Sequence, residues 1–138
     1  MDRLFLDANV LFSAAYRPNA GVQRLWKLTD AALFTSCYAA EEARLNLAEP
    51  PQRERLHRLL HKVEVLPVHP DLPLPPSIKL PEKDRPILQA AIYIRATHLL
   101  TGDLSHFGRH FGKTVSGVLI LAPGDYLRLK SAKTRAGD

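Results

Sequence analysis

Four acidic side chains stand beside apolar segments of this 138-residue sequence. Two short apolar runs end in Asp7 and Asp103, and Asp84 precedes a strongly apolar stretch. A fourth acid, either Glu41 or Glu42, follows a third apolar run. Carboxylates that converge repel one another unless they are protonated or bridged by cations, and oxygen ligands without histidine or thiolate select Mg²⁺ or Mn²⁺. Convergence of these acids would therefore create a site for a divalent cation.

The apolar runs also predict the elements that position these acids. A short apolar run with a polar stop is typical of a central strand in a parallel sheet, because helices cover both of its faces. Ligands bind beyond the carboxyl ends of such strands. We expect strands in residues 4–6, 31–36, 63–68, 98–102 and 116–122, and helices in residues 8–16, 20–30, 37–49, 52–62, 84–94 and 124–129. This alternation predicts an α/β fold, a three-layer α/β/α sandwich with a mostly parallel central sheet.

Composition and charge limit the classes of function. The chain carries 19 Lys and Arg against 14 Asp and Glu, and its formal net charge of +5 favours polyanionic partners such as nucleic acid. No apolar run approaches the length of a membrane span, so we expect a cytoplasmic protein without a membrane partner. We expect one folded domain in residues 1–128 and a basic, disordered tail in residues 129–138. Residues 67–81 hold six of the eleven prolines, which predicts an extended connection.

Four segments carry a resemblance to a known family. They read LFLDANVLFSA at the start, SCYAAEEARLNL after the run at 31–36, EKDRPILQAA in the later helix, and LLTGD followed by GVLILAPGDYL near the end. Their order and spacing resemble those of the PIN domains, a family of PilT N-terminus-like, metal-dependent ribonucleases that includes the VapC-type toxins of bacterial toxin–antitoxin pairs. The resemblance extends from about residue 3 to about residue 128 and implies a PIN-like fold.

The resemblance implies four residues that are both catalytic and metal-binding, namely Asp7, Glu42, Asp84 and Asp103. Glu42 is preferred to Glu41 because the family's glutamate usually lies six residues after the serine at the helix start, here Ser36. Periodicity alone leaves both glutamates open. Two supporting residues also match the family: Thr101 is the small hydroxyl residue before the last aspartate, and Asn9 is the polar residue near the first.

One position departs from the family pattern. Many members carry another acid two or three residues beyond the last aspartate, where this chain has Ser105 and His106. Four acids rather than five remain, so the number of metal ions, one or two, stays open. His106 and His110 have a helical spacing and could assist a scissile phosphate, but two glycines and Arg109 lie nearby. We interpret this segment as a flexible basic loop near the site.

The activity that the resemblance implies is hydrolysis of phosphodiester bonds in RNA, assisted by Mg²⁺ or Mn²⁺. In this interpretation Asp7, Asp84 and Asp103 are direct or water-mediated metal ligands, and Glu42 either binds metal or orients the attacking water. The first choice of function is the toxin component of a type II toxin–antitoxin pair. Its partners would be an RNA substrate, an antitoxin protein and a second copy of the chain in a homodimer.

Three alternatives lie in other functional classes. The first is an RNA-processing nuclease outside any toxin system. The second is a PIN-like module that binds RNA or protein without cutting, although such modules would usually lack one or more acids and here all four are present. The third is a phosphatase of the haloacid-dehalogenase type, which needs a second aspartate two residues after the first. Asn9 occupies that position and disfavours the phosphatase.

Overall fold

A six-stranded, mostly parallel sheet forms the centre of the molecule. The computed structural model describes residues 1–137, with side chains described for residues 1–133. The strands follow the spatial order β3-β2-β1-β4-β6-β5, and all neighbours are parallel except β5 and β6. The strand bounds are β1 Asp2–Leu6, β2 Ala31–Ser36, β3 Glu64–Leu66, β4 His98–Leu100, β5 Thr114–Val115 and β6 Val118–Leu121.

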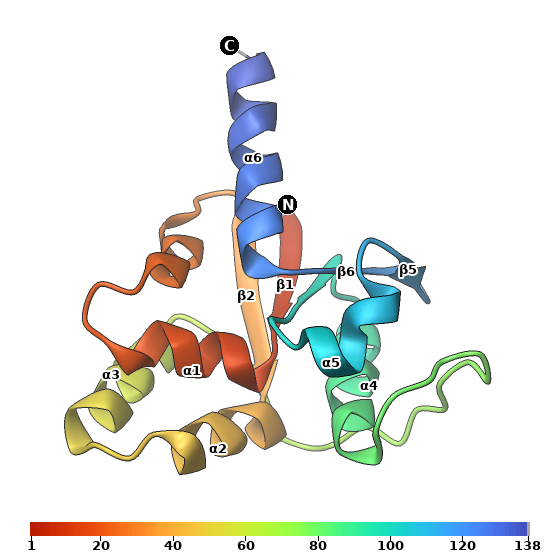
Figure 1. The fold of residues 1–138 in the computed structure, drawn as a ribbon, viewed down its shortest axis with the longest axis horizontal. Coiled ribbons are helices and arrows are strands. Elements are labelled where there is room, and N and C mark those ends of the chain that lie inside the picture. The colour runs from red at the N-terminus through yellow and green to blue at the C-terminus, as the bar shows by residue number, and fades with distance from the viewer. Residues whose placement is uncertain (138) are drawn as a thin grey trace.

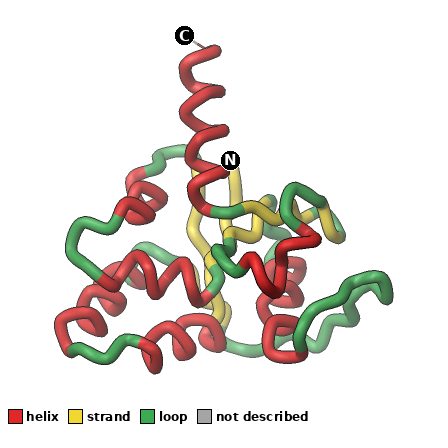
Figure 2. Tube along the Cα trace, viewed as in Figure 1, coloured by secondary structure: helices red, strands yellow, loops and turns green. Residues whose placement is uncertain are grey.

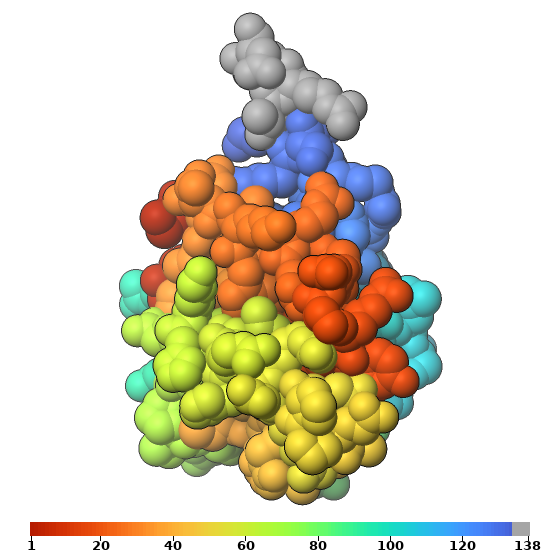
Figure 3. Space-filling view, turned by 90° about the vertical axis from the view of Figure 1, so that its left-hand side faces the viewer, coloured from red at the N-terminus to blue at the C-terminus, as the bar shows by residue number. Residues whose placement is uncertain are grey.

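Helices cover both faces of this sheet. In Figure 1 the helices α1 and α3 lie on one side of β1 and β2, and α4 and α5 lie on the other. Figure 3 shows the first side, where the orange to yellow-green segments that include η1, α2 and α3 hide the strands. The helix bounds are α1 Ala8–Tyr16, η1 Gly21–Lys27, α2 Cys37–Asn46, α3 Pro50–Leu60, η2 Glu82–Asp84, α4 Arg85–Tyr93, α5 Leu104–Phe107, η3 Gly108–His110 and α6 Pro123–Gly137. The predicted three-layer α/β/α sandwich is confirmed.

The two central strands are apolar on both faces, as parallel strands covered by helices must be. Leu4, Phe5 and Leu6 of β1 are fully buried, and so are Leu99 and Leu100 of β4. Burial of such side chains contributes roughly 1.5–3 kcal/mol each. Polar residues therefore begin only where these strands leave the core, at their carboxyl ends.

The ends of β1 and β4 lie at the point where the order of strands along the sheet reverses. From β1 the chain passes outward to β2 and β3, whereas β4 returns to the other edge of β1 and continues to β6. The backbone N–H of Asp7 donates to the carbonyl of Leu100 at 3.1 Å and ties the two ends together. Ligands of open parallel sheets bind at such a switch point, beyond the carboxyl ends of the strands.

The structure differs from the sequence prediction in several segments. The short elements α5, η3 and β5 were not expected. The helix expected in residues 20–30 is the 3-10 helix η1, which ends at Lys27. Residues 129–137 of the expected basic, disordered tail 129–138 continue α6 as far as Gly137, and residue 138 lies outside the described residues. Lys130 explains part of this order, because its ammonium group lies 2.7 Å from Asp30 and 3.4 Å from Asp2 and so fastens the helix to the start of β1.

The proline-rich connection agrees with its prediction. Residues 67–81 form neither helix nor strand, and Figure 2 shows them as a long loop beside α4. Proline lacks the backbone N–H that a helix or an inner strand requires. Within residues 1–137, no helix is both long and apolar enough to cross a membrane.

Candidate metal centre

Asp7 is the most deeply buried carboxylate of the site, with 4% of its surface exposed. It follows β1 and caps α1, since its Oδ1 accepts a hydrogen bond from the N–H of Ala8 at 2.6 Å. Its Oδ2 accepts from the hydroxyl of Thr101 at 2.8 Å. Burial raises the pKa of Asp7 to about 6, the hydrogen bonds offset part of this rise, and the charges of Asp84 and Glu42 add to it.

The two supporting residues join the ends of β1 and β4. Asn9 accepts a hydrogen bond from the N–H of Gly102 at 2.8 Å and donates weakly to Asp7 at 3.4 Å. The Thr101 hydroxyl, besides donating to Asp7, accepts from the N–H of Asp103 at 3.1 Å. These bonds fix the orientation of Asp7 and Asp103 relative to each other.

Asp103 caps the short helix α5. Its Oδ1 accepts from the N–H of His106 at 3.1 Å and from the hydroxyl of Ser105 at 2.9 Å. Burial alone would raise the pKa of Asp103, but these hydrogen bonds and the nearby imidazole of His106 outweigh it and hold the pKa below its usual value. The carboxylate form of Asp103 is therefore stabilised, and its Oδ2 points away from the cap.

Asp84 ends η2 and precedes α4, yet its side chain does not cap that helix. Its Oδ2 lies 2.8 Å from Nδ1 of His106, which in turn lies 2.6 Å from Oδ2 of Asp103. Burial is the main cause that raises the pKa of Asp84, and the charge of Asp103 adds to it, while His106 and Lys83 act in the opposite direction. Asp84 is therefore oriented toward the site and not toward the helix end.

The two candidate glutamates have different surroundings. Glu42 lines the same pocket as the three aspartates. Glu41 is exposed and forms an ion pair at 2.6 Å with Arg44 on the surface of α2. The start of α2 sets this difference, because the Ser36 hydroxyl caps the helix by accepting from the N–H of Ala39 at 3.1 Å. The structure therefore brings Glu42, and not Glu41, to the other acids.

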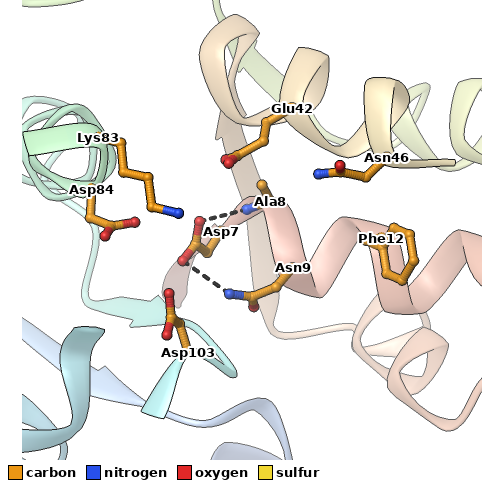
Figure 4. Close-up of a pocket in the computed structure, with 9 residues that line it drawn as sticks. All are labelled: Asp7, Ala8, Asn9, Phe12, Glu42, Asn46, Lys83, Asp84 and Asp103. Carbon is orange, nitrogen blue, oxygen red and sulfur yellow. Dashed lines mark hydrogen bonds between the residues drawn. The ribbon is translucent and has the colours of Figure 1, made fainter. Parts of the chain in front are cut away.

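Figure 4 shows the pocket that these residues form, with the carboxylates of Glu42, Asp84 and Asp103 arranged around that of Asp7. Its volume is about 450 Å³, and the amino group of Lys83 points into it between Asp84 and Asp7. The lining residues are Asp7, Ala8, Asn9, Phe12, Glu42, Asn46, Lys83, Asp84 and Asp103. Four acids from four separate segments of the chain thus share one cavity with one lysine.

The donor atoms in this pocket fit a divalent cation. Asp84, Asp103 and His106 each offer one atom, and these three atoms lie within 4.8 Å of one another. Nδ1 of His106 lies 2.8 Å from Oδ2 of Asp84 and 2.6 Å from Oδ2 of Asp103. Oδ2 of Asp84 and Nδ1 of His106 are nevertheless buried without a contact of hydrogen-bond geometry in the described part of the chain. Such atoms are rare in folded proteins and are expected where an ion binds.

His106 is the residue of this site that the sequence interpretation misplaced. It belongs to α5 and contacts two of the acids, whereas the sequence predicted a flexible basic loop. The side chains that could hold a cation here therefore include one nitrogen donor beside the carboxylates. The available signal was the spacing of three residues from Asp103, which puts both side chains on one face of a helical turn. His110, by contrast, is buried elsewhere, with Nε2 3.3 Å from the carbonyl of Lys79.

No protein-family profile and no curated protein matches this sequence. Solved structures do resemble it. A chain in the structure of VapBC2 from Rickettsia felis bound to a promoter DNA fragment matches with a TM-score of 0.61 and 14% identity, over 87% of this chain and 98% of that one. FitAcB from Neisseria gonorrhoeae matches with a TM-score of 0.55 and 22% identity, over 87% and 97%.

A third similar structure is VapBC-1 from nontypeable Haemophilus influenzae, with a TM-score of 0.54 and 17% identity over 88% of this chain and 98% of that one. At these identities the likeness is one of fold. The PIN-like fold that the sequence resemblance implies is thereby confirmed, and it extends over nearly the whole chain.

Proposed function

We propose that this protein is a metal-dependent endoribonuclease and the toxin component of a type II toxin–antitoxin pair. One observation carries the proposal: the carboxylates of Asp7, Glu42, Asp84 and Asp103 come from four separate segments and line one pocket at the switch point of the sheet. Four acids in one cavity destabilise the folded state because like charges repel. Their convergence is therefore best explained by a function that requires them, such as binding of a cation.

The proposed roles follow from the contacts of each residue. Asp84 and Asp103 hold Mg²⁺ or Mn²⁺, since each has an Oδ2 atom that takes no part in helix capping. When bound, such an ion acidifies a water molecule and withdraws charge from a phosphodiester. Asp7 accepts hydrogen bonds on both oxygens and fixes the base of the site. Glu42 either contributes to metal binding or orients the attacking water from α2.

Lys83 is proposed to bind the phosphate of the substrate. Its amino group points into the acidic pocket, and a nuclease needs positive charge beside its metal ligands because RNA and carboxylates repel each other. The net charge of +5 supports binding of a polyanion in the cytoplasm over a small neutral substrate.

The assignment to a toxin is supported by the structural matches. Two of the similar structures named above are VapBC proteins, and VapC-type toxins are among the PIN-domain proteins that the sequence resembles. An antitoxin is accordingly the proposed protein partner, and a homodimer is the proposed assembly.

The direct test is incubation of the purified chain with structured and unstructured RNA in Mg²⁺, in Mn²⁺ and in EDTA. We expect cleavage with either ion and none in EDTA. Asp103→Asn supplies the matched control, because it keeps the size of the side chain and removes its charge. Cleavage that continues in EDTA, or in the Asp103→Asn protein with metal, would refute the proposal.

A further inference from the structure

We propose that His106, which contacts Asp84 and Asp103 but is not among the residues that line the pocket, is a nitrogen ligand of the ion that these two acids hold. The site would then favour Mn²⁺ over Mg²⁺ more strongly than carboxylates alone would. The inference rests on the proposed function, because it concerns the ion that the nuclease would use. It also goes beyond that function, since the sequence resemblance implies only carboxylate ligands.

The position of the imidazole carries the first step of the argument. Nδ1 of His106 lies between two carboxylates, 2.6 Å from Oδ2 of Asp103 and 2.8 Å from Oδ2 of Asp84. One atom from each residue lies within 4.8 Å of the others. Ligand atoms that surround one ion at about 2 Å have separations of this order.

The second step comes from two buried atoms, Nδ1 of His106 and Oδ2 of Asp84, which lie 2.8 Å apart without the geometry of a hydrogen bond. Nδ1 of His106 and Oδ2 of Asp84 are both buried, and neither has a hydrogen-bond partner among the described residues. Only 8% of the surface of Asp84 is exposed, so its carboxylate has little contact with solvent. A buried polar atom without a hydrogen bond destabilises the folded state, and more so if it is charged. A shared cation would satisfy both atoms at once.

The third step is that the fold holds His106 in this place. Asp103 caps α5 by accepting from the N–H of His106 through Oδ1, and the Ser105 hydroxyl donates to the same oxygen. Both bonds leave Oδ2 of Asp103 to face Nδ1 of His106. Phe107, the next residue, is fully buried and anchors the helical turn in the core. The histidine and the aspartate are thus presented together by one short element.

The identity of the donor determines the preferred ion. Carboxylates suit Mg²⁺ and Mn²⁺ alike, whereas imidazole suits transition-metal ions, of which Mn²⁺ is one, better than Mg²⁺, which takes oxygen ligands. One imidazole among carboxylates should therefore shift the preference toward Mn²⁺ without abolishing Mg²⁺ binding.

The test measures binding of Mn²⁺ and Mg²⁺ to the full chain, in the absence of RNA. Titration of Mn²⁺, followed by the paramagnetic resonance signal of the free ion, gives its affinity, and competition gives that of Mg²⁺. Since loss of groups that merely orient ligands costs 10- to 100-fold in affinity, we expect His106→Gln to weaken Mn²⁺ binding by at least about tenfold. The ratio of Mn²⁺ to Mg²⁺ affinity should fall in His106→Gln and in His106→Asp.

Pulsed paramagnetic resonance on protein labelled with ¹⁵N-histidine tests the bond itself. We expect Mn²⁺ bound to the wild type to show coupling to a histidine nitrogen. This coupling should disappear in His106→Gln and persist in His57→Gln, because His57 is exposed on α3 outside the pocket. If His106→Gln does not fold, as judged by circular dichroism, His106→Asp replaces it, since a carboxylate there restores the acid common in the family.

Bound Mn²⁺ without histidine coupling in the wild type would overturn the inference, and so would coupling that survives both substitutions. RNA cleavage measured on the same samples separates this failure from that of the proposed function. Cleavage with Mn²⁺ but no coupling refutes only the role of His106. Coupled Mn²⁺ without cleavage of any RNA refutes only the nuclease.

Discussion

The hydroxyl of Thr101 donates to Oδ2 of Asp7 at 2.8 Å and accepts from the N–H of Asp103 at 3.1 Å. One fully buried hydroxyl thus connects the acids at the ends of β1 and β4. We expect Thr101→Val to lose about 1–3 kcal/mol of unfolding free energy, because it leaves a buried acceptor and a donor without a partner.

Thr101→Ser is the control for this prediction, since it retains the hydroxyl and loses only a methyl group. It should cost roughly 1 kcal/mol or less. Urea unfolding of both variants in EDTA measures the difference. Equal losses in Val and Ser would mean that packing of the methyl group, and not the hydrogen bonds, determines the stability at this position.

The raised pKa of Asp7 makes the stability of the metal-free protein depend on pH. The ordinary value of 3.8 applies to the unfolded chain, and the folded value is about 6. Below pH 3.8 the carboxyl group is protonated in both states and imposes no penalty. Between pH 3.8 and about 6, Asp7 is ionised in the unfolded chain but still largely protonated in the folded protein. The unfolding free energy therefore falls as the pH rises through this range.

Asp7→Asn should remove this loss. The unfolding free energy of the variant minus that of the wild type is expected to increase by up to about 3 kcal/mol as the pH rises from about 4 to about 8. Urea unfolding at the two pH values in EDTA measures this gain, and other carboxyl groups cancel in the comparison. Parallel pH profiles for the two proteins would contradict the assignment of the raised pKa to Asp7.

The neighbouring glutamates of α2 permit a matched pair of substitutions. Glu42→Gln removes charge from the pocket, whereas Glu41→Gln removes it from an exposed ion pair with Arg44. We expect Glu42→Gln to reduce RNA cleavage by about a hundredfold or more, corresponding to about 3 kcal/mol of transition-state stabilisation. Glu41→Gln should remain close to the wild type. Initial rates in Mn²⁺ give both values, and equal loss in the two variants would exclude a special role for Glu42.

Binding of a divalent cation should stabilise the fold. An ion at 100 times its dissociation constant adds about 2.7 kcal/mol to the unfolding free energy. We expect Mn²⁺ to raise the melting temperature of the wild type above its value in EDTA, and Asp103→Asn to abolish most of this rise. Asp125→Asn is the control, because Asp125 is an exposed residue of α6 outside the pocket. A metal-induced rise of the same size in Asp103→Asn would place the ion elsewhere.

RNA binding should weaken steeply with salt, because each neutralised phosphate releases counterions. If Lys83 contacts a phosphate, Lys83→Gln should reduce the slope of log affinity against log salt by about 0.7, the value for one contact on single-stranded nucleic acid. Lys133→Gln, on α6, should leave the slope nearly unchanged. Fluorescence anisotropy with non-cleaved RNA in EDTA measures these slopes. Identical slopes for the wild type and Lys83→Gln would remove Lys83 from the binding site.

The strands could be predicted from the sequence because their signal is local. The buried runs of β1 and β4 are apolar at every position and end in a polar residue, so the pattern predicts both the strand and the edge where the acids meet. The start of α2 is likewise local, since Ser36 caps the helix through a bond to Ala39. These elements were sufficient to predict the sandwich.

Features that depend on contacts between distant segments escaped the prediction. His106 approaches Asp84 only because α5 packs near the segment before α4. Lys130, in the middle of α6, contacts Asp2 and Asp30, which are far from it in the sequence. The 3-10 form of η1 has no periodic signature in so short a segment, and Trp26 fixes it through a bond at 2.9 Å to the carbonyl of Leu59.

The pairing of β1 with β4 also determines when during synthesis the pocket can exist. The hydroxyl that holds Asp7 lies 94 residues further along the chain, and Asp103 follows it. A nascent chain that has not yet emerged past β4 therefore carries Asp7, Glu42 and Asp84 in an unclosed sheet, without Thr101 and Asp103. For the proposed ribonuclease, a chain that stops before Thr101 therefore lacks both Asp103 and the hydroxyl that orients Asp7.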